Sequence, residues 1–244
     1  MSITRVIPRL DIKNEFVIKG IHLEGLRKIG DPNLLAKKYY HQGADEIIFM
    51  DAVAAYYDRN SLSHIIEKAC EDVFIPITVG GGIRSIEDIQ SLLNAGADKV
   101  AINTHAIRNP NFINEASRIF GSQCIVASVE AKKINEGKYL AYYDNGREST
   151  DYDVFDWLNE LVDRGAGEVM LTSIDNEGTN KGFDINLSKL ANESVSVPII
   201  SSGGCGDLEH IENLINETHI SGVSVASILH YDKYTIEEIK NKIK

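Results

Sequence analysis

One motif occurs twice in this chain, half a chain length apart. The stretch PITVGGGIRSIEDI at 76–89 and the stretch PIISSGGCGDLEHI at 198–211 both contain a short apolar run, a glycine pair and apolar residues at helical spacing. Pro198 follows Pro76 by 122 residues, which is half of the chain's 244. A strand, a glycine turn and a helix repeated at this interval predict a (βα)8 TIM barrel built as two similar half-barrels.

The two glycine turns predict two anion-binding sites. Gly81 and Gly82 in the first half align with Gly203 and Gly204 in the second. Glycines at the end of a strand let the backbone approach a ligand closely and direct N–H groups at an anion. A single turn of this kind is best explained as a tight connection, but the second copy favours a functional interpretation. We therefore expect a ligand with a phosphate at each end, bound about equally well at the two turns.

The length of the chain fits one barrel domain over residues 1–244. A single (βα)8 barrel has about 250 residues, and eight strand–helix pairs can be placed along this sequence without a linker. Residues 14–29 are expected to form a long polar loop after the first strand. The turn sequences NEG at 135–137 and DNG at 144–146 flank residues 138–143, so a small hairpin is expected there.

The composition argues against several classes of function. A formal net charge of −11 disfavours binding to nucleic acid or to a membrane surface. The three cysteines have no framework spacing, and no signal segment or long apolar run occurs, so a cytoplasmic setting is expected. None of the seven histidines has metal-ligand spacing. We expect these histidines to be ordinary surface or loop residues, and we expect no metal or other cofactor.

The chemistry of such a barrel is expected at its mouth, where the strands have their C-terminal ends. The polar residues predicted to lie there are Asp11, Asp51, Asn103, Thr104, Glu130, Thr172, Ser173 and Ser227. Asp11 and Glu130 occupy equivalent positions in the two halves, so they should face each other across the mouth. Two opposed carboxylates suit general acid–base catalysis, in which one gives a proton and the other takes one. Solvated carboxylates that cap helices are the simpler alternative, and the symmetry of the halves favours the catalytic one.

The floor of the barrel, where the strands have their N-terminal ends, is expected to hold a ring of charges. Strand alternation directs four charged side chains inward at this end: Arg5, Glu46, Lys99 and Glu168. Two positive and two negative groups can close into a neutral ring. Such a ring is either a polar plug that seals the floor or a gate.

Several stretches distributed over essentially the whole chain point to one family. They are IPRLDIK, VIKG, LRKIGDP, GADEIIFMD, IPITVGGGIRS, GADKVAIN, FGSQCIV, RGAGEVMLTSID, SSGGCG and VASILH. With these stretches the chain resembles the cyclase subunits of imidazole glycerol phosphate synthase, the HisF family. FGSQCIV and RGAGEVMLTSID are specific to this family rather than common to phosphate-binding barrels.

The resemblance implies a reaction and a partner. A glutaminase subunit would dock on the floor and release ammonia, which would pass the ring of charges and travel up the barrel. At the mouth the ammonia would react with a bisphosphate ribulosyl aminoimidazole-carboxamide nucleotide (PRFAR). The products would be imidazole glycerol phosphate, for histidine biosynthesis, and AICAR. The protein is thus expected to be a lyase/cyclase within a glutamine amidotransferase complex.

The same resemblance gives roles to particular residues. Asp11 and Glu130 stand at the positions of the catalytic carboxylates, and Lys19 matches a loop lysine that closes over the substrate. The expected substrate- and phosphate-binding residues are Gly81, Gly82, Asn103, Thr104, Thr172, Gly203, Gly204, Ala226 and Ser227. The expected ammonia gate consists of Arg5, Glu46, Lys99 and Glu168. Asp98 is the expected docking residue for the glutaminase.

The reacting centre departs from the family pattern. Arg9 stands in place of a cysteine, Glu130 and Glu177 in place of aspartates, and residues 53–55 (VAA) in place of Thr-Ala-Ser. A displacement of about 1 Å in a reacting centre can cost about 10²-fold in rate. Two functions therefore stay open. The intact glycine turns and Asp11 favour the cyclase, and the departures favour a paralogous ammonia-delivery subunit that serves a separate amidotransferase in surface-sugar biosynthesis.

Strand alternation also directs Arg9 into the barrel, two residues before Asp11. A guanidinium in the barrel interior needs a carboxylate partner, because an unpaired buried charge is costly. Glu130 is one methylene longer than the family's aspartate, so we expect Arg9 and Glu130 to pair and to narrow the upper channel. The pairing would hold Glu130 ionised and leave most of the acid–base role to Asp11.

Overall fold

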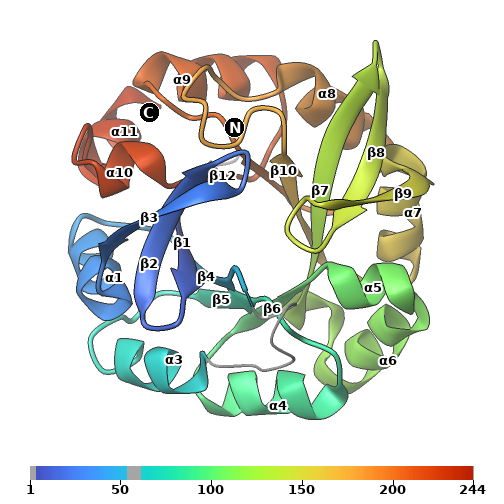
Figure 1. Cartoon of the computed structure of the whole chain (residues 1–244), viewed down its shortest axis with the longest axis horizontal. Coiled ribbons are helices and arrows are strands. Elements are labelled where there is room, and N and C mark those ends of the chain that lie inside the picture. Colours follow the sequence, from blue (N-terminus) through green and yellow to red (C-terminus); the bar gives the residue numbers. More distant parts are fainter. Residues whose placement is uncertain (1–3, 54–61, 244) are drawn as a thin grey trace.

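Eight parallel strands form a closed barrel in the computed structural model, which describes residues 4–53 and 62–243 (Figure 1). In order around the ring, the barrel strands are β1 (Arg5–Lys13), β4 (Ile47–Asp51), β5 (Ile77–Gly80), β6 (Lys99–Ile102), β7 (Ile125–Asn135), β10 (Glu168–Ser173), β11 (Ile199–Ser202) and β12 (Gly222–Val225). The ring closes because β12 pairs with β1 and β10 pairs with β7, in parallel in both cases. The (βα)8 fold predicted from the half-length repeat is confirmed.

Helices form an outer layer around the strands (Figure 1). The longer ones are α1 (Pro32–His41), α3 (Ser63–Ala69), α4 (Ile86–Asn94), α6 (Asn111–Phe120), α7 (Val154–Asp163), α8 (Ile185–Ser194), α9 (Leu208–Glu217) and α11 (Ile236–Lys242). Capping residues in the sequence mark the starts of several of these helices. Asp31 caps α1 with Pro32 at its first position, and Ser85 forms a reciprocal capping box with Asp88 at the start of α4.

The apolar side chains of the barrel form two separate clusters. The larger cluster lies between the strands and the helices and extends through both halves, from Val6 on β1 to Ile239 on α11. The smaller cluster fills the barrel interior and consists of Ile7, Ile48, Ala101, Val126, Met170 and Ile200. On the strands that contribute to both clusters, neighbouring residues therefore belong to different cores, as expected for a barrel whose interior is packed with side chains.

Two strand excursions rise from the mouth. Residues 14–29 were expected to form a loop, but most of them form a hairpin of β2 (Phe16–Ile21) and β3 (Glu24–Gly30). The reason is that β1 continues to Lys13 and pairs with β2, which buries Val17 and Ile18. The expected hairpin at 138–143 is confirmed, since β8 (Lys138–Tyr143) pairs with both β7 and β9 (Glu148–Asp153).

Short helices occur at positions where the sequence analysis placed none. α5 (Thr104–Arg108) follows β6 and α10 (Ser227–His230) follows β12, and a 3-10 turn, η1 (Ser122–Cys124), precedes β7. α5 and α10 occupy equivalent positions in the two halves, so the internal repeat includes them. Helices of four or five residues are too short to produce a recognisable apolar period, which is why they escaped prediction.

Candidate active site

The two glycine turns have similar backbone geometry. All four glycines have positive φ: +97° at Gly81, +71° at Gly82 and +99° at both Gly203 and Gly204. A side chain is strained in this region of φ, and at Gly81, Gly203 and Gly204 a Cβ would also collide with neighbouring backbone. The obstacle at Gly81 is Asp51, the last residue of β4, and the obstacle at Gly203 is Ser173, the last residue of β10. Each turn therefore packs against the end of the preceding strand of its own half-barrel.

A cavity of about 180 Å³, here called the first cavity, opens beside the first turn. The predicted site residues that line it are Gly81, Gly82, Asn103, Thr104 and Glu130. Three basic residues also line it, and the sequence analysis did not include them: Arg84, His105 and Arg108. Their positions in the sequence could have indicated this placement. Arg84 follows the glycine turn, and the other two lie on α5, directly after β6. Backbone N–H groups and basic side chains around one cavity suit an anionic ligand.

The second cavity, beside Gly203 and Gly204, is much smaller, at about 20 Å³. Ala226 and Ser227 line it as predicted, together with Arg9, Lys19 and Glu177. Lys19 and Glu177 form a buried ion pair. The Glu177 Oε2 atom lies 3.4 Å from the position that a Cβ on Gly203 would take, so this carboxylate sits over the second turn. The protein thus places one of its own anions beside the predicted phosphate-binding residues.

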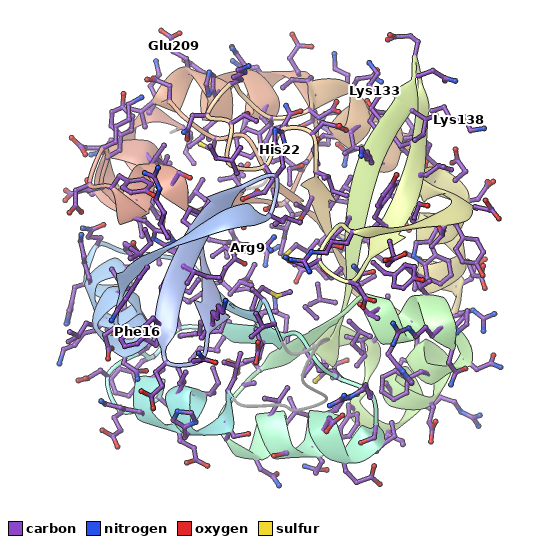
Figure 2. The ribbon with its side chains drawn as sticks, viewed as in Figure 1. Arg9, Phe16, His22, Lys133, Lys138 and Glu209 are labelled. Atoms are coloured by element: carbon purple, nitrogen blue, oxygen red, sulfur yellow. The ribbon has the colours of Figure 1, made fainter. Side chains whose placement is uncertain are left out.

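The β2–β3 hairpin carries Lys19 to this position. The backbone N–H of His22, at the hairpin tip, donates to the carbonyl oxygen of Glu177 at 2.8 Å. The Nδ1 atom of His22 lies 2.9 Å from the carbonyl oxygen of Ile174. Figure 2 shows His22 at the end of the hairpin that crosses the mouth. The hairpin therefore rests on the loop that follows β10.

The two candidate catalytic carboxylates have different surroundings. Burial alone would raise the pKa of Asp11, but the charges of Arg9 and Lys19 hold it below its usual value. Burial raises the pKa of Glu130 to about 7, against the opposing effects of Arg9 and of hydrogen bonds from Gly146 and Asn103. Near neutral pH, Asp11 is thus a carboxylate and Glu130 is partly protonated.

Arg9 lies inside the barrel, as predicted, and is 5 % exposed (Figure 2). Its expected pairing with Glu130 is wrong. The Nε atom of Arg9 donates to Asp11 Oδ1 at 2.8 Å, and Nη1 donates to Thr172 Oγ1 at 3.2 Å. Asp11 is two residues ahead on the same strand face, so the guanidinium reaches it without spanning the barrel. The expected consequence is reversed as well, because Asp11 is the carboxylate held ionised.

Asn103 and Gly146 account for the position of Glu130. The side-chain amide of Asn103 donates to Glu130 Oε2 at 3.0 Å, and the backbone N–H of Gly146 donates to the same atom at 2.8 Å. Gly146 belongs to the turn between β8 and β9, so the second excursion reaches back to the mouth. Asn103, which is expected to bind phosphate, thus also holds a carboxylate at the mouth.

The four charged residues predicted at the floor do form a ring. Arg5 donates to Glu46 at 2.7 Å and also pairs with Glu168. Lys99 lies 2.8 Å from Glu46 and 2.7 Å from Glu168. Each cation therefore contacts both carboxylates, and the inner apolar cluster lies between this ring and the mouth. Asp98 is exposed at the same end, and its Oδ2 accepts a hydrogen bond of 2.8 Å from the backbone N–H of Ile77.

His230 contradicts the expectation that all the histidines are ordinary surface or loop residues. It lies on α10, is 9 % exposed and shares a hydrogen bond of 2.7 Å with the hydroxyl of Tyr39. Burial, reinforced by the charge of Lys19, lowers the pKa of His230 to about 4. It is therefore uncharged at neutral pH. Its place in the apolar stretch VASILH was the available signal for burial.

The fold and site together define a class of protein: duplicated (βα)8 barrels with equivalent glycine turns and two carboxylates at the mouth, and a ring of charges at the floor. None of the described helices is both long and apolar enough to cross a membrane. Within residues 4–53 and 62–243, no group of His, Cys, Asp or Glu side chains is arranged to hold a metal ion.

Comparison with known proteins narrows this class. Residues 5–235 match the model of a family described as Histidine biosynthesis protein. The imidazole glycerol phosphate synthase subunit HisF of Legionella pneumophila is 57% identical over 209 residues, which cover 86% of this chain and 99% of that protein. The subunit of the same name from Bacillus cereus (strain G9842) is 44% identical over 244 residues, covering 100% of this chain and 97% of the relative. The chain belongs to the histidine biosynthesis protein family and, within it, to the HisF subunits.

Proposed function

We propose that this chain is the cyclase subunit of an imidazole glycerol phosphate synthase and acts in histidine biosynthesis. The observation that carries the proposal is that one barrel has two different sites, one at each end. A ring of two cations and two carboxylates lies at the floor, and two unlike carboxylates lie between glycine turns at the mouth. The names of both relatives support the same function. The reaction would convert PRFAR and ammonia to imidazole glycerol phosphate, AICAR and water.

The substrate carries two phosphates, and each half-barrel supplies one group of residues to bind them. One phosphate would lie against Gly81, Gly82, Asn103 and Thr104, and the other against Gly203, Gly204, Ala226 and Ser227. Local donors have to hold these groups because the net charge of −11 repels anions at long range. At the second turn the carboxylate of Glu177 would have to move aside.

The reaction needs both a proton acceptor and a proton donor. Ammonia loses protons as its nitrogen forms bonds to carbon, and the departing AICAR nitrogen gains one. Asp11 and Glu130 are carboxyl groups at the mouth with separated pKa values, a pattern typical of paired acid and base residues. Lys19, which the hairpin holds at the second cavity, is placed to meet the substrate once Glu177 releases it.

We also propose that a glutaminase subunit docks on the floor and supplies the ammonia. The name of each relative describes a subunit of a synthase, which supports a complex. Arg5, Glu46, Lys99 and Glu168 would act as the gate through which ammonia enters, and exposed Asp98 beside the ring would contact the partner. The free thiols of the three cysteines support a cytoplasmic setting for this complex.

The first experiment supplies ammonia directly. The purified chain is incubated with PRFAR and an ammonium salt, and AICAR is followed by chromatography. We expect turnover with ammonia and none with glutamine alone. Asp11→Asn should lower kcat by about 10²-fold or more, the scale of a lost general acid–base residue. Glu209→Gln, a matched loss of one carboxylate on the exposed face of α9, should leave kcat unchanged.

The second experiment adds a glutaminase subunit of the same synthase type. We expect glutamine then to support turnover, and Asp98→Lys to lower the glutamine-dependent rate while the ammonia-dependent rate is kept. A chain that binds the glutaminase but never converts PRFAR, even with ammonia, would instead favour the ammonia-delivery subunit of a separate amidotransferase. A chain that neither binds the glutaminase nor converts PRFAR would contradict both functions.

A further inference from the structure

Asp11 and Glu130 occupy equivalent positions in the two half-barrels, yet within residues 4–53 and 62–243 a cation is hydrogen-bonded to Asp11 and none to Glu130. Asp11 Oδ1 accepts a hydrogen bond of 2.8 Å from Arg9 Nε. The same guanidinium is held from the opposite half-barrel by Thr172 on β10, at 3.2 Å. Glu130 Oε2 accepts from two neutral donors, the amide of Asn103 and the N–H of Gly146. The internal symmetry of the barrel is therefore broken at the reacting centre by the side chain of Arg9.

The charged and titratable groups around Asp11 come from several elements. They are Arg9 on β1, Lys19 on β2, His230 on α10, Glu130 on β7 and Glu177 in the loop after β10. Lys19 is paired with Glu177, and His230 is buried and uncharged at neutral pH. Among the described residues, Arg9 is therefore the cation that contacts Asp11. A charge-assisted hydrogen bond of this kind both orients a carboxylate and stabilises its ionised form.

Glu130 faces a different set of groups. Arg9 and Asp11 act on it from β1, and the wall of the first cavity also contains Asp51, Arg84, His105 and Arg108. No cation among the described residues is hydrogen-bonded to Glu130, and no hydrogen bond from those residues reaches its Oε1 atom. Because Glu130 lines the first cavity, Oε1 can carry a proton and present it to a ligand there.

We infer that Arg9 is a positioning residue that divides the acid and base roles between the two carboxylates. It fixes Asp11 as the proton acceptor and leaves Glu130, through Oε1, as the proton donor. Ammonia first condenses with the carbonyl group of the substrate, which releases water. In the step that follows, the imidazole ring closes and the bond to the AICAR nitrogen breaks, while a proton passes from Glu130 to that departing nitrogen and another passes from the ammonia-derived nitrogen to Asp11. The pair keeps its total charge, and return of the proton from Asp11 to Glu130 restores the starting state. The inference deepens the proposed function and rests on it.

The direct test is a titration that does not require turnover. The wild-type chain is labelled with ¹³C at the Asp and Glu carboxyl carbons, and the two signals are assigned with Asp11→Asn and Glu130→Gln. We expect Glu130 to titrate near pH 7 and Asp11 well below it. In Arg9→Met, which keeps length and loses charge, the Asp11 midpoint should rise by about one unit or more, a tenfold change in proton affinity. In Arg9→Lys it should stay close to the wild type.

Two results would overturn the inference. One is an Asp11 midpoint that is the same in Arg9→Met as in the wild type. The other is a wild-type chain in which Glu130 titrates below Asp11, a result that needs no variant at position 9 and so does not depend on whether Arg9→Met folds.

The pH profile of the reaction gives the second readout. It is measured with PRFAR at a constant concentration of free NH3, so that protonation of ammonia does not shape the curve. In the wild type, kcat/KM should fall on the acid side as Asp11 gains a proton and on the alkaline side as Glu130 loses one. Arg9→Met should move the acid limb to higher pH by about one unit or more, and Arg9→Lys should keep the wild-type acid limb.

A merely structural role for Arg9 would lower the rate by the same factor at every pH, and this outcome would contradict the inference. Failure of the proposed function looks different. The wild-type chain would then show the expected carboxyl titrations and no turnover of PRFAR.

Discussion

Glu46 is the most buried member of the floor ring, with 1 % of its surface exposed. It accepts from Arg5 at 2.7 Å, from Lys99 at 2.8 Å and from the hydroxyl of Thr78. Glu46→Gln keeps the shape and leaves two cations with Glu168 as their one remaining carboxylate in the ring. We expect a loss of about 2–3 kcal/mol in the free energy of unfolding, because one positive charge of the partly buried ring is left uncompensated. Urea denaturation measures it.

Glu217→Gln is the matched control for this prediction. Glu217 pairs with Lys189 on the surface, where the two side chains are 55% and 43% exposed. Exposed ion pairs are worth about 0–1 kcal/mol, so this variant should be close to the wild type. Equal losses in the two variants would show that the ring contributes no more than a surface pair.

His230 makes stability depend on pH. The imidazole takes up a proton near pH 6.5 in the unfolded chain but only near pH 4 in the folded protein. The unfolded chain therefore binds more protons between these values, and stability falls as pH drops through this window. Between pH 7.5 and 5, the wild type should lose about 2 kcal/mol more than His230→Phe. Denaturant titrations of both proteins at both pH values measure this difference. Glu130, whose pKa is raised, has the opposite effect on stability, but it is present in both proteins and its contribution cancels. Parallel stability curves would contradict the prediction.

Charge pairing was only partly predictable from the sequence. The floor ring followed from strand alternation alone, because the alternation directs all four charged side chains at the strand starts into the barrel. The partner of Arg9 did not follow, since alternation places it near both Asp11 and Glu130. The choice depends on Asn103 and Gly146, which hold Glu130 on the other side of the mouth. Gly146 comes from the turn between β8 and β9, and no local pattern indicates that this turn folds back.

At the scale of elements, the β2–β3 hairpin determines how the two glycine turns differ. It brings Lys19 to Glu177 over the second turn, whereas the first turn faces an open cavity of about 180 Å³. The sequence predicted the turns but missed the hairpin. Residues 14–29 read as a polar loop because the pairing that buries Val17 is made with β1, an element outside that window.

This difference predicts unequal binding of inorganic phosphate, in contrast to the equal binding expected from the repeat alone. The wild type should bind phosphate more tightly at Gly81–Gly82 than at Gly203–Gly204. Glu177→Ala should raise affinity at the second turn by about tenfold, equivalent to about 1.4 kcal/mol, because a competing carboxylate is removed. Amide shifts of the four glycines in ¹⁵N spectra report each turn separately.

Asp175→Asn is the control for that experiment, since Asp175 lies in the same loop but accepts from the backbone N–H of Lys133 at 2.8 Å. It should leave both affinities unchanged. Saturation of both turns at the same phosphate concentration in the wild type would contradict the prediction.

At the scale of the whole molecule, the ring of strands and the larger apolar cluster join both halves. Arg5 on β1 lies opposite Gly222 on β12, so the first and last barrel strands depend on each other. We expect one cooperative unfolding transition, despite the internal duplication. Trp157 is buried on α7 in the second half, and its fluorescence reports unfolding there. The transition followed by this fluorescence should coincide with the transition followed by far-UV circular dichroism of the whole chain. Two separated transitions would show that the halves unfold independently.

Because the barrel is closed, its eight strands have no free edge, and the strand edges through which two copies of this protein could pair lie on the two excursions. In the described part of the chain, β3 pairs with β2 alone and β9 with β8 alone, so each leaves an outer edge without a strand partner. Such edges can template sheet growth between molecules. β9 carries Glu148, Asp151 and Asp153, and β3 carries Arg27 and Lys28. Two molecules that met through the same edge would bring like charges together, which disfavours pairing between equivalent edges.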